Sequence, residues 1–179
     1  VARVERVKSP NYLFVYLAID ASATPGAFDI VFTSGDQSIE HPYELRRKNQ
    51  DPAYTQGFSQ KDAIYLLTPD RFANGDPGND YIEAMGDVLD RDDDYARHGG
   101  DLAGVEQHLD YIADMGFTQI WMNPVLENRV ARASYHGYST TDFYRVDPRF
   151  GDNEQYRALT AKARELGVGM IMDMIVNHI

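Results

Sequence analysis

The chain has 179 residues, a formal net charge of −11 at pH 7 and no cysteine. Its excess of Asp and Glu repels phosphate backbones and anionic lipid headgroups, so neither nucleic acid nor a membrane surface is an expected partner. The lack of cysteine excludes disulfides, thiolate metal sites and a cysteine nucleophile. No apolar run approaches the roughly 18 residues of a membrane span. The first residues contain neither an initiator Met nor an apolar signal-peptide core, so we expect a processed or incomplete chain.

The first part of the chain has the composition of β-strands. Residues 12–19 and 27–33 are rich in aromatic and β-branched side chains, and turn residues follow each run. We therefore expect antiparallel strands, and we interpret residues 1–45 as the C-terminal part of an N-terminal β-sandwich domain. Residues 46–61 are polar and rich in turn-forming residues, which predicts a linker.

Residues 62–179 show a different pattern. Apolar runs at 63–67, 117–122 and 168–176 predict three strands. Asp101 and Asp152 are expected to cap the two helices between them, and Gln155 is placed to complete a capping box with Asp152. This β-α-β-α-β order predicts an α/β fold with a parallel sheet, and such sheets carry their chemistry at the carboxyl ends of the strands.

An acidic loop, residues 70–80, follows the first of these strands. It is rich in carboxylate and amide oxygens, which are the ligands that Ca²⁺ prefers, and its glycines and proline allow a tight fold. It is not an EF-hand loop, because Met85 stands where that motif needs a bidentate Glu. Composition alone also fits an ordinary polar surface turn. The candidate calcium ligands are Asn74, Asp76, Asn79, Asp80, Gly99 and Asp101.

The other two strand ends also carry polar residues. Asp173 lies inside the third predicted strand, where an unpaired charge is costly, so it should have a positive or hydrogen-bonding partner. His178 leaves that strand together with Asn177, and it is either a structural residue or a ligand contact. The loop 134–144 is dense in aromatic rings, which either stack on a sugar or pack on one another.

Five motifs in order resemble the α-amylase superfamily, glycoside hydrolase family 13, and within it the cyclomaltodextrinase and neopullulanase branch. They are I-Y-L-L-T-P-D-R-F-A-N-G-D-P-G-N-D, G-G-D-L-A-G-V, W-M-N-P-V-L-E-N, Y-H-G-Y-S-T-T-D-F-Y-R-V-D-P-R-F-G and D-M-I-V-N-H. The resemblance implies that residues 62–179 are the first portion of a (β/α)₈ TIM barrel, ending after its third strand. It also implies action on α-1,4-glucans or cyclodextrins.

The resemblance implies roles for individual residues. His178 and Tyr138 match positions that contact one sugar at the cleavage subsite, and the six candidate calcium ligands match the N-terminal calcium loop of the family. Asn177 matches a second calcium position that this branch often lacks, so we leave it unassigned. The resemblance also leaves room for a homo-oligomer formed through the N-terminal domain. The compartment stays open, and a periplasmic or secreted location is favoured over a cytoplasmic one.

The resemblance also implies that the catalytic residues are missing. A retaining glycosidase needs two carboxyl groups about 5 Å apart. In this family they follow later strands, and neither Asp142 nor Asp173 matches a catalytic position. We therefore expect this chain alone to be inactive, and we name no catalytic residue. The alternative is a non-catalytic module that binds calcium and carbohydrate.

Overall fold

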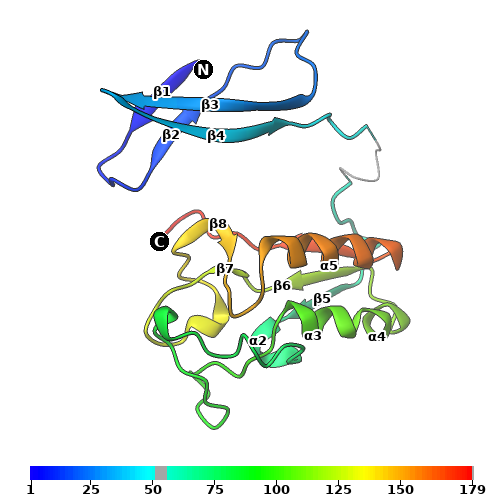
Figure 1. Ribbon diagram of the computed structural model, residues 1–179. Coiled ribbons are helices and arrows are strands. Elements are labelled where there is room, and N and C mark those ends of the chain that lie inside the picture. Colours follow the sequence, from blue (N-terminus) through cyan, green and yellow to red (C-terminus); the bar gives the residue numbers. More distant parts are fainter. Residues whose placement is uncertain (51–55, 179) are drawn as a thin grey trace. The chain divides into compact units, whose positions relative to one another are not determined.

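The computed structural model describes residues 1–50 and 56–178. The chain forms two compact units, Val1–Gln56 and Gly57–Ile179. Figure 1 shows the strands of the first unit in blue and cyan, and the mixed helices and strands of the second unit in colours from cyan to red. None of the helices in the described ranges is long and apolar enough to cross a membrane.

The first unit consists of antiparallel strand pairs, as its composition predicts. Strand β1 (Arg3–Arg6) pairs with β2 (Leu13–Tyr16), and β3 (Gly26–Ser34) forms a long hairpin with β4 (Gln37–Leu45). Gly35 makes the hairpin turn with a φ of 58°, a conformation that glycine adopts without steric cost. The sequence did not indicate β1 and β4, because both strands are rich in charged and polar residues. The boundaries at 45/46 and 61/62 remain predictions.

The second unit has a three-stranded parallel sheet. Strands β5 (Ile64–Leu67), β6 (Gln119–Met122) and β9 (Gly169–Met172) lie in the order β5-β6-β9. Helices α3 (Leu102–Gln107) and α4 (Leu109–Asp114) connect the first two strands, and α5 (Asn153–Glu165) precedes the third. The predicted β-α-β-α-β order is therefore present. The connections also contain α2 (Pro69–Phe72), η1 (Glu83–Met85), β7 (Leu126–Glu127), η2 (Ser134–His136) and β8 (Asp142–Val146).

The helices cover one face of this sheet, and the core lies between them (Figure 1). Ile120 and Met122 of β6 point into this core and are almost completely buried. The alternate residues point to the opposite face, because successive side chains of a strand alternate. There Leu66, Trp121 and Ile171 lie in one row across the three strands. Leu66 is 58% exposed and Trp121 38% exposed, so the described elements of this unit leave that face open.

Both predicted helix caps are present. The Asp101 carboxylate accepts from the backbone N–H of Gly104 at 2.6 Å, and Asp152 and Gln155 form the reciprocal capping box. The single helix expected after Asp101 is divided at His108, so that expectation was wrong. The His108 ring contacts the Gly104 carbonyl at 2.8 Å, and its backbone N–H turns to Val105 instead. The ring thus occupies the acceptor that a continuous helix would give to the backbone.

The strand predicted at 168–176 is also shorter than expected. It ends at Met172 because β9 pairs only with β6 among the described strands. Beyond Met172 the backbone has no ladder partner, and Met174 and Val176 are 47% and 83% exposed. Apolar composition marked this segment as strand-forming, but hydrogen-bonded pairing with a neighbour decides where a strand ends.

Candidate functional site

A tight turn, Ser134–Tyr138, lies at the carboxyl end of the parallel sheet. Gly137 has a φ of 80°, and a side chain at this position would collide with the backbone carbonyl of Pro124, in the loop that follows β6. Only glycine permits so close an approach. Asn123, at the end of β6, donates to the His136 carbonyl at 3.5 Å. The turn is therefore held against the end of the second strand of the sheet.

Tyr138 connects this turn to the end of the third strand. Its hydroxyl donates to Oδ2 of Asp173 at 3.1 Å, and Nε1 of Trp121 donates to the same oxygen at 3.0 Å. Asp173 thus has the hydrogen-bonding partners that the sequence demanded. Burial raises the pKa of Tyr138, and the bond to the Asp173 carboxylate raises it further. The tyrosine therefore stays a protonated donor, and its ring is held in one orientation.

The structure brings the two predicted sugar-contacting residues together. Nε2 of His178 donates to the backbone carbonyl of Tyr138 at 2.9 Å, and the Asn177 side-chain amide contacts Nδ1 of His178 at 3.1 Å. His178 remains exposed. The exposed imidazole of His178 therefore lies against the backbone of Tyr138 at the rim. Side chains of these types can pack on the apolar face of a sugar.

His136 fixes the backbone between these residues. Its Nδ1 accepts from the backbone N–H of Tyr138 at 2.9 Å. Burial lowers the pKa of His136 below its usual 6.5. The ring is thus neutral at neutral pH, which is the state in which Nδ1 can accept a hydrogen bond. The aromatic loop packs partly on itself, since the rings of His136 and Tyr138 lie 5.7 Å apart.

The acidic loop after β5 closes around the carboxylate of Asp101. Oδ1 accepts from the backbone N–H groups of Gly75 at 3.0 Å and Gly104 at 2.6 Å. Oδ2 accepts from the backbone N–H of Asp76 at 2.8 Å and from the side-chain amide of Asn79 at 3.2 Å. One carboxylate therefore caps α3 and holds the loop against it. The sequence predicted the cap and assigned Asp101 to calcium, but it gave no sign of this clasp.

The same loop has the features of a cation site. The side-chain oxygens of Asn74 and Asn79 are buried and have no hydrogen-bond partner. A side chain at Gly99 would lie 2.6 Å from Oδ1 of Asp80, so the Gly99 backbone closely approaches that carboxylate. No group of three or more His, Asp or Glu able to hold a metal occurs among the described residues. Amide, carbonyl and carboxylate oxygens are the ligand types that Ca²⁺ takes in proteins, so the donor chemistry of the loop is compatible with this ion.

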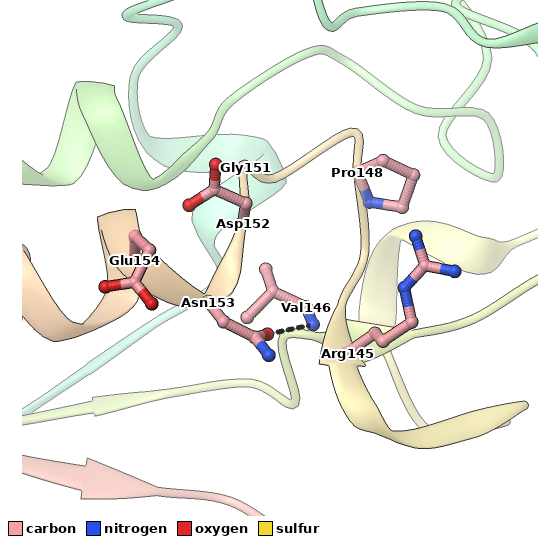
Figure 2. A pocket seen from close by; sticks show the side chains of 7 residues that line it. All are labelled: Arg145, Val146, Pro148, Gly151, Asp152, Asn153 and Glu154. Atoms are coloured by element: carbon pink, nitrogen blue, oxygen red, sulfur yellow. Dashed lines mark hydrogen bonds between the residues drawn. The ribbon is translucent and has the colours of Figure 1, made fainter. Parts of the chain in front are cut away.

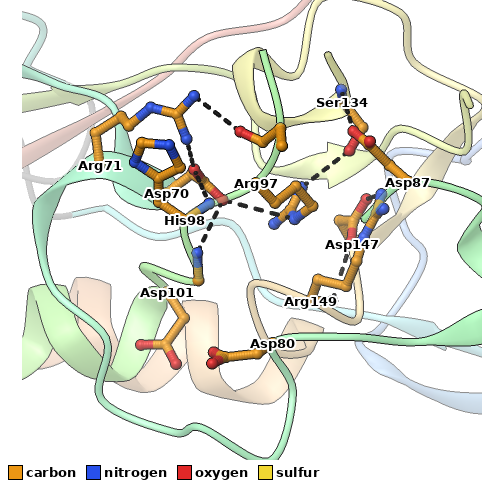
Figure 3. Close-up of polar contacts among 12 residues, drawn as sticks. Asp70, Arg71, Asp80, Asp87, Arg97, His98, Asp101, Ser134, Asp147 and Arg149 are labelled. Carbon is orange, nitrogen blue, oxygen red and sulfur yellow. Dashed lines mark hydrogen bonds and ion pairs between the residues drawn. The ribbon is translucent and has the colours of Figure 1, made fainter. Parts of the chain in front are cut away.

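Sequence reasoning missed a buried charge network beside this loop. Arg97 is fully buried, with its Nε 3.6 Å from Oδ1 of Asp70 and its Cζ 4.4 Å from the Phe150 ring centre. Arg71 forms an ion pair with the other oxygen of Asp70. Figure 3 shows Asp70 between the two arginines. Burial lowers the pKa of Arg97 and the nearby Arg149 adds to this effect, whereas Asp147, Asp70 and Asp87 oppose it.

A second buried pair lies next to Arg97. Arg149 forms a bidentate ion pair with Asp147: Nε lies 2.9 Å from Oδ1, and Nη2 lies 2.8 Å from Oδ2. Both side chains are buried. Burial raises the pKa of Asp147, but Arg149 and Arg97 outweigh this effect and hold that pKa below its usual value. The D-P-R motif carried these residues in the sequence, but nothing in their spacing indicated burial.

A surface cleft of about 320 Å³ lies at the start of α5 (Figure 2). Its wall includes Asn153, whose side-chain oxygen accepts from the backbone N–H of Val146 at 2.9 Å. The contact ties the end of β8 to the first turn of the helix. None of the predicted sugar or calcium residues lines this cleft.

Both parts of the chain match known protein families. The model of the alpha amylase catalytic domain matches residues 65–179. The chain belongs to the alpha-amylase family. Residues 1–49 match the model of the cyclomaltodextrinase N-terminal domain. The family's organisation, in which an N-terminal domain precedes the catalytic barrel domain, therefore applies to this chain.

Individual members of the family support the same assignment. The chain is 41% identical to a beta/alpha-amylase of Paenibacillus polymyxa over 66% of its own length, and 36% identical to neopullulanase 2 of Thermoactinomyces vulgaris over 69%. A solved Anoxybacillus alpha-amylase is 42% identical over 66% of this chain, with a TM-score of 0.61. The chain spans 10% and 21% of the first two proteins and 25% of the third.

Proposed function

We propose that the chain is part of a retaining glycoside hydrolase that cleaves α-1,4-glucosidic bonds, of the cyclomaltodextrinase or neopullulanase type. In this proposal β5, β6 and β9 are the first three strands of an eight-stranded barrel. The open row of Leu66, Trp121 and Ile171 supports it, because inward-pointing apolar residues fill the interior of such barrels. The observation that carries the function is the convergence of Tyr138, Asp173 and His178 at the carboxyl ends of these strands.

The proposed substrate is a glucan with α-1,4 bonds, as a cyclodextrin, a maltooligosaccharide, pullulan or starch. Tyr138 would stack on one glucose unit, and the exposed His178 imidazole would contact the same unit. A hydrolase of Arthrobacter globiformis, 30% identical to this chain over 63% of its length, was solved with cyclic α-maltosyl-(1→6)-maltose, which supports a cyclic or linear maltosyl ligand.

In this proposal the residues of the chain bind and orient the sugar, and the two carboxyl groups of a retaining mechanism come from other parts of the full protein. Asp173 is a carboxylate in contact with Tyr138, but its Oδ2 already accepts from two side chains. Such an oxygen is suited to holding a ring in place and poorly placed to attack a glycosidic carbon. We therefore propose that Asp173 orients the Tyr138 ring and takes no direct part in bond cleavage.

We further propose that Asn74, Asp76, Asn79, Asp80 and the Gly99 carbonyl bind one Ca²⁺, with Asp101 beside them. The unpartnered amide oxygens of Asn74 and Asn79 support the proposal, since buried polar atoms in native proteins normally have a partner. Bound calcium would supply a positive charge that ties the loop after β5 to the start of α3. It has no part in bond cleavage in this proposal.

The test uses the protein encoded by the complete reading frame. We expect it to release reducing ends from β-cyclodextrin and maltoheptaose, with the α-anomer formed first by proton NMR, because retention preserves the configuration. Binding of maltoheptaose by calorimetry with no release of reducing ends would instead favour the non-catalytic module. Initial formation of the β-anomer would contradict the retaining mechanism.

A further inference from the structure

The carboxylate of Asp70 joins the two ends of the long connection between β5 and α3. Asp70 is 1% exposed and accepts from the backbone N–H groups of His98 at 2.8 Å and Gly99 at 3.3 Å. It therefore fixes the segment that leads into the cap of α3. Its two oxygens also face the guanidinium groups of Arg71 and Arg97 (Figure 3).

Both arginines extend from Asp70 to the turn that carries Tyr138. The Arg71 guanidinium lies over the Tyr135 ring, with Cζ 3.9 Å from the ring centre. Nη1 of Arg97 donates to the Ser134 hydroxyl at 3.4 Å. Consecutive residues of the turn are thus held by two cations that share one anion. Asp87 completes the support, because it accepts from the backbone N–H of Ser134 at 2.9 Å.

The turn needs such support because its entry is strained. Ala133 has a φ of 59° and a ψ of 25°, the left-handed region that costs a residue with a side chain about 1 kcal/mol. A residue keeps such a conformation only when its surroundings impose it. The contacts on Ser134 and Tyr135, immediately after Ala133, provide that constraint.

Burying Arg97 is a poor way to stabilise a fold. Its Nε and Nη2 have no hydrogen-bond partner, and an imperfectly paired buried charge is often less favourable than an apolar residue of similar size. Arg71 is different, since its side chain is 25% exposed and also donates to the carbonyls of Asp94 and Ala96. Arg97 thus places a positive charge next to Ser134 of the turn, although burying this charge contributes little to the stability of the fold.

We propose that Arg71 and Arg97, anchored on Asp70, are positioning residues for sugar binding: they set the place of the Tyr138 ring by holding Ser134 and Tyr135. This inference rests on the proposed function, because it takes Tyr138 as a sugar contact. Neither arginine touches the sugar, so both act through the turn. Removing either one should matter only as long as the Tyr138 ring is there to be placed.

A double-mutant cycle in the full-length protein tests this, with kcat/KM on maltoheptaose as the readout. We choose Arg71→Met because this side chain is partly exposed and Met keeps the apolar stem. Arg71→Met should lower kcat/KM about tenfold, mainly through KM, and Tyr138→Ala about a hundredfold. The variant with both changes should match Tyr138→Ala within about twofold, because residues that act through one another are not additive.

Arg132→Met is the matched control. Arg132 also lies over a tyrosine ring, with Cζ 5.1 Å from the centre of Tyr95, but it is exposed and that ring lies outside the turn. It should leave kcat/KM within about twofold of the wild type. Multiplying losses in the double variant, or an unchanged KM in Arg71→Met, would overturn the inference. No hydrolysis by the wild type would overturn the proposed function itself, and an unaffected Tyr138→Ala would remove Tyr138 from the site.

Discussion

The hydroxyl of Tyr138 and the carboxylate of Asp173 are joined by a 3.1 Å hydrogen bond. One residue belongs to an irregular turn, and the other follows the last residue of β9. The bond fixes the side chain of a loop residue relative to the end of a sheet strand. A ring that is to meet a sugar at a fixed angle needs such fixation, because side-chain disorder at a binding site reduces affinity.

The aromatic ring and the hydroxyl of Tyr138 should have separable effects on kcat/KM. Tyr138→Phe keeps the ring and removes only the bond to Asp173, so it should lower kcat/KM on maltoheptaose about tenfold. Tyr138→Ala also removes the stacking surface and should lower it about a hundredfold. Neither change should shift the melting temperature by more than a few degrees. Tyr144→Ala, at a tyrosine that is 73% exposed in β8, serves as the control and should change neither quantity. Equal losses in both Tyr138 variants would contradict a stacking role.

Calcium removal should destabilise the full-length protein. A ligand that binds only the folded state at a hundredfold excess over its Kd contributes about 2.7 kcal/mol. Melting curves recorded with calcium and with a chelator should therefore differ. Asn79→Ala, which removes an unpartnered buried oxygen, should shrink this difference, whereas Asp92→Asn in the exposed part of the following loop should not. Identical melts combined with no calcium in elemental analysis would rule out the site.

Acid should loosen the turn at His136. Burial lowers the pKa of this residue in the folded state, so the unfolded chain takes up the proton first as the pH falls. Stability is thus complete above the unfolded value of 6.5 and declines below it until the folded ring is also protonated. His136→Asn keeps an acceptor for the Tyr138 N–H but does not titrate. The wild type should lose more melting temperature than this variant between pH 7.5 and pH 5. His41→Asn, at an exposed histidine in β4, should behave like the wild type.

The buried ion pair should be far more sensitive than an exposed one. Asp147→Asn leaves the Arg149 charge buried without its counter-charge, which should cost about 3–5 kcal/mol of unfolding free energy. Glu154→Gln removes the partner of Arg157 at the exposed start of α5, and it should cost less than about 1 kcal/mol. Urea denaturation measures both values. Similar costs for the two variants would mean that the Asp147–Arg149 pair is not the desolvated contact described here.

Local signals in the sequence predicted local structure well. Asp101 and Asp152 cap their helices because a cap depends on residues three positions apart. Tyr138 and His178 meet although they are far apart in sequence, as the resemblance to the α-amylase superfamily implied.

Structure that depends on distant partners could not be predicted in this way. The end of β9 is set by a neighbouring strand, and the division of the helix at His108 is set by a side chain that competes for a carbonyl. Arg97 lies in a polar, turn-rich stretch whose composition indicates exposure, yet it is fully buried. Arg97 is buried because loops close over it, and no periodic pattern in the sequence indicates this burial.

The carboxylate of Asp101 controls the hydrogen–deuterium exchange of several backbone amides together. The backbone N–H groups of Gly75, Asp76 and Gly104 all depend on it, although they belong to a loop and to a helix. Breaking this one contact set frees all three amides together. Their hydrogen–deuterium exchange should therefore proceed at one shared opening free energy, and the helix start should be unable to fray while the loop stays closed.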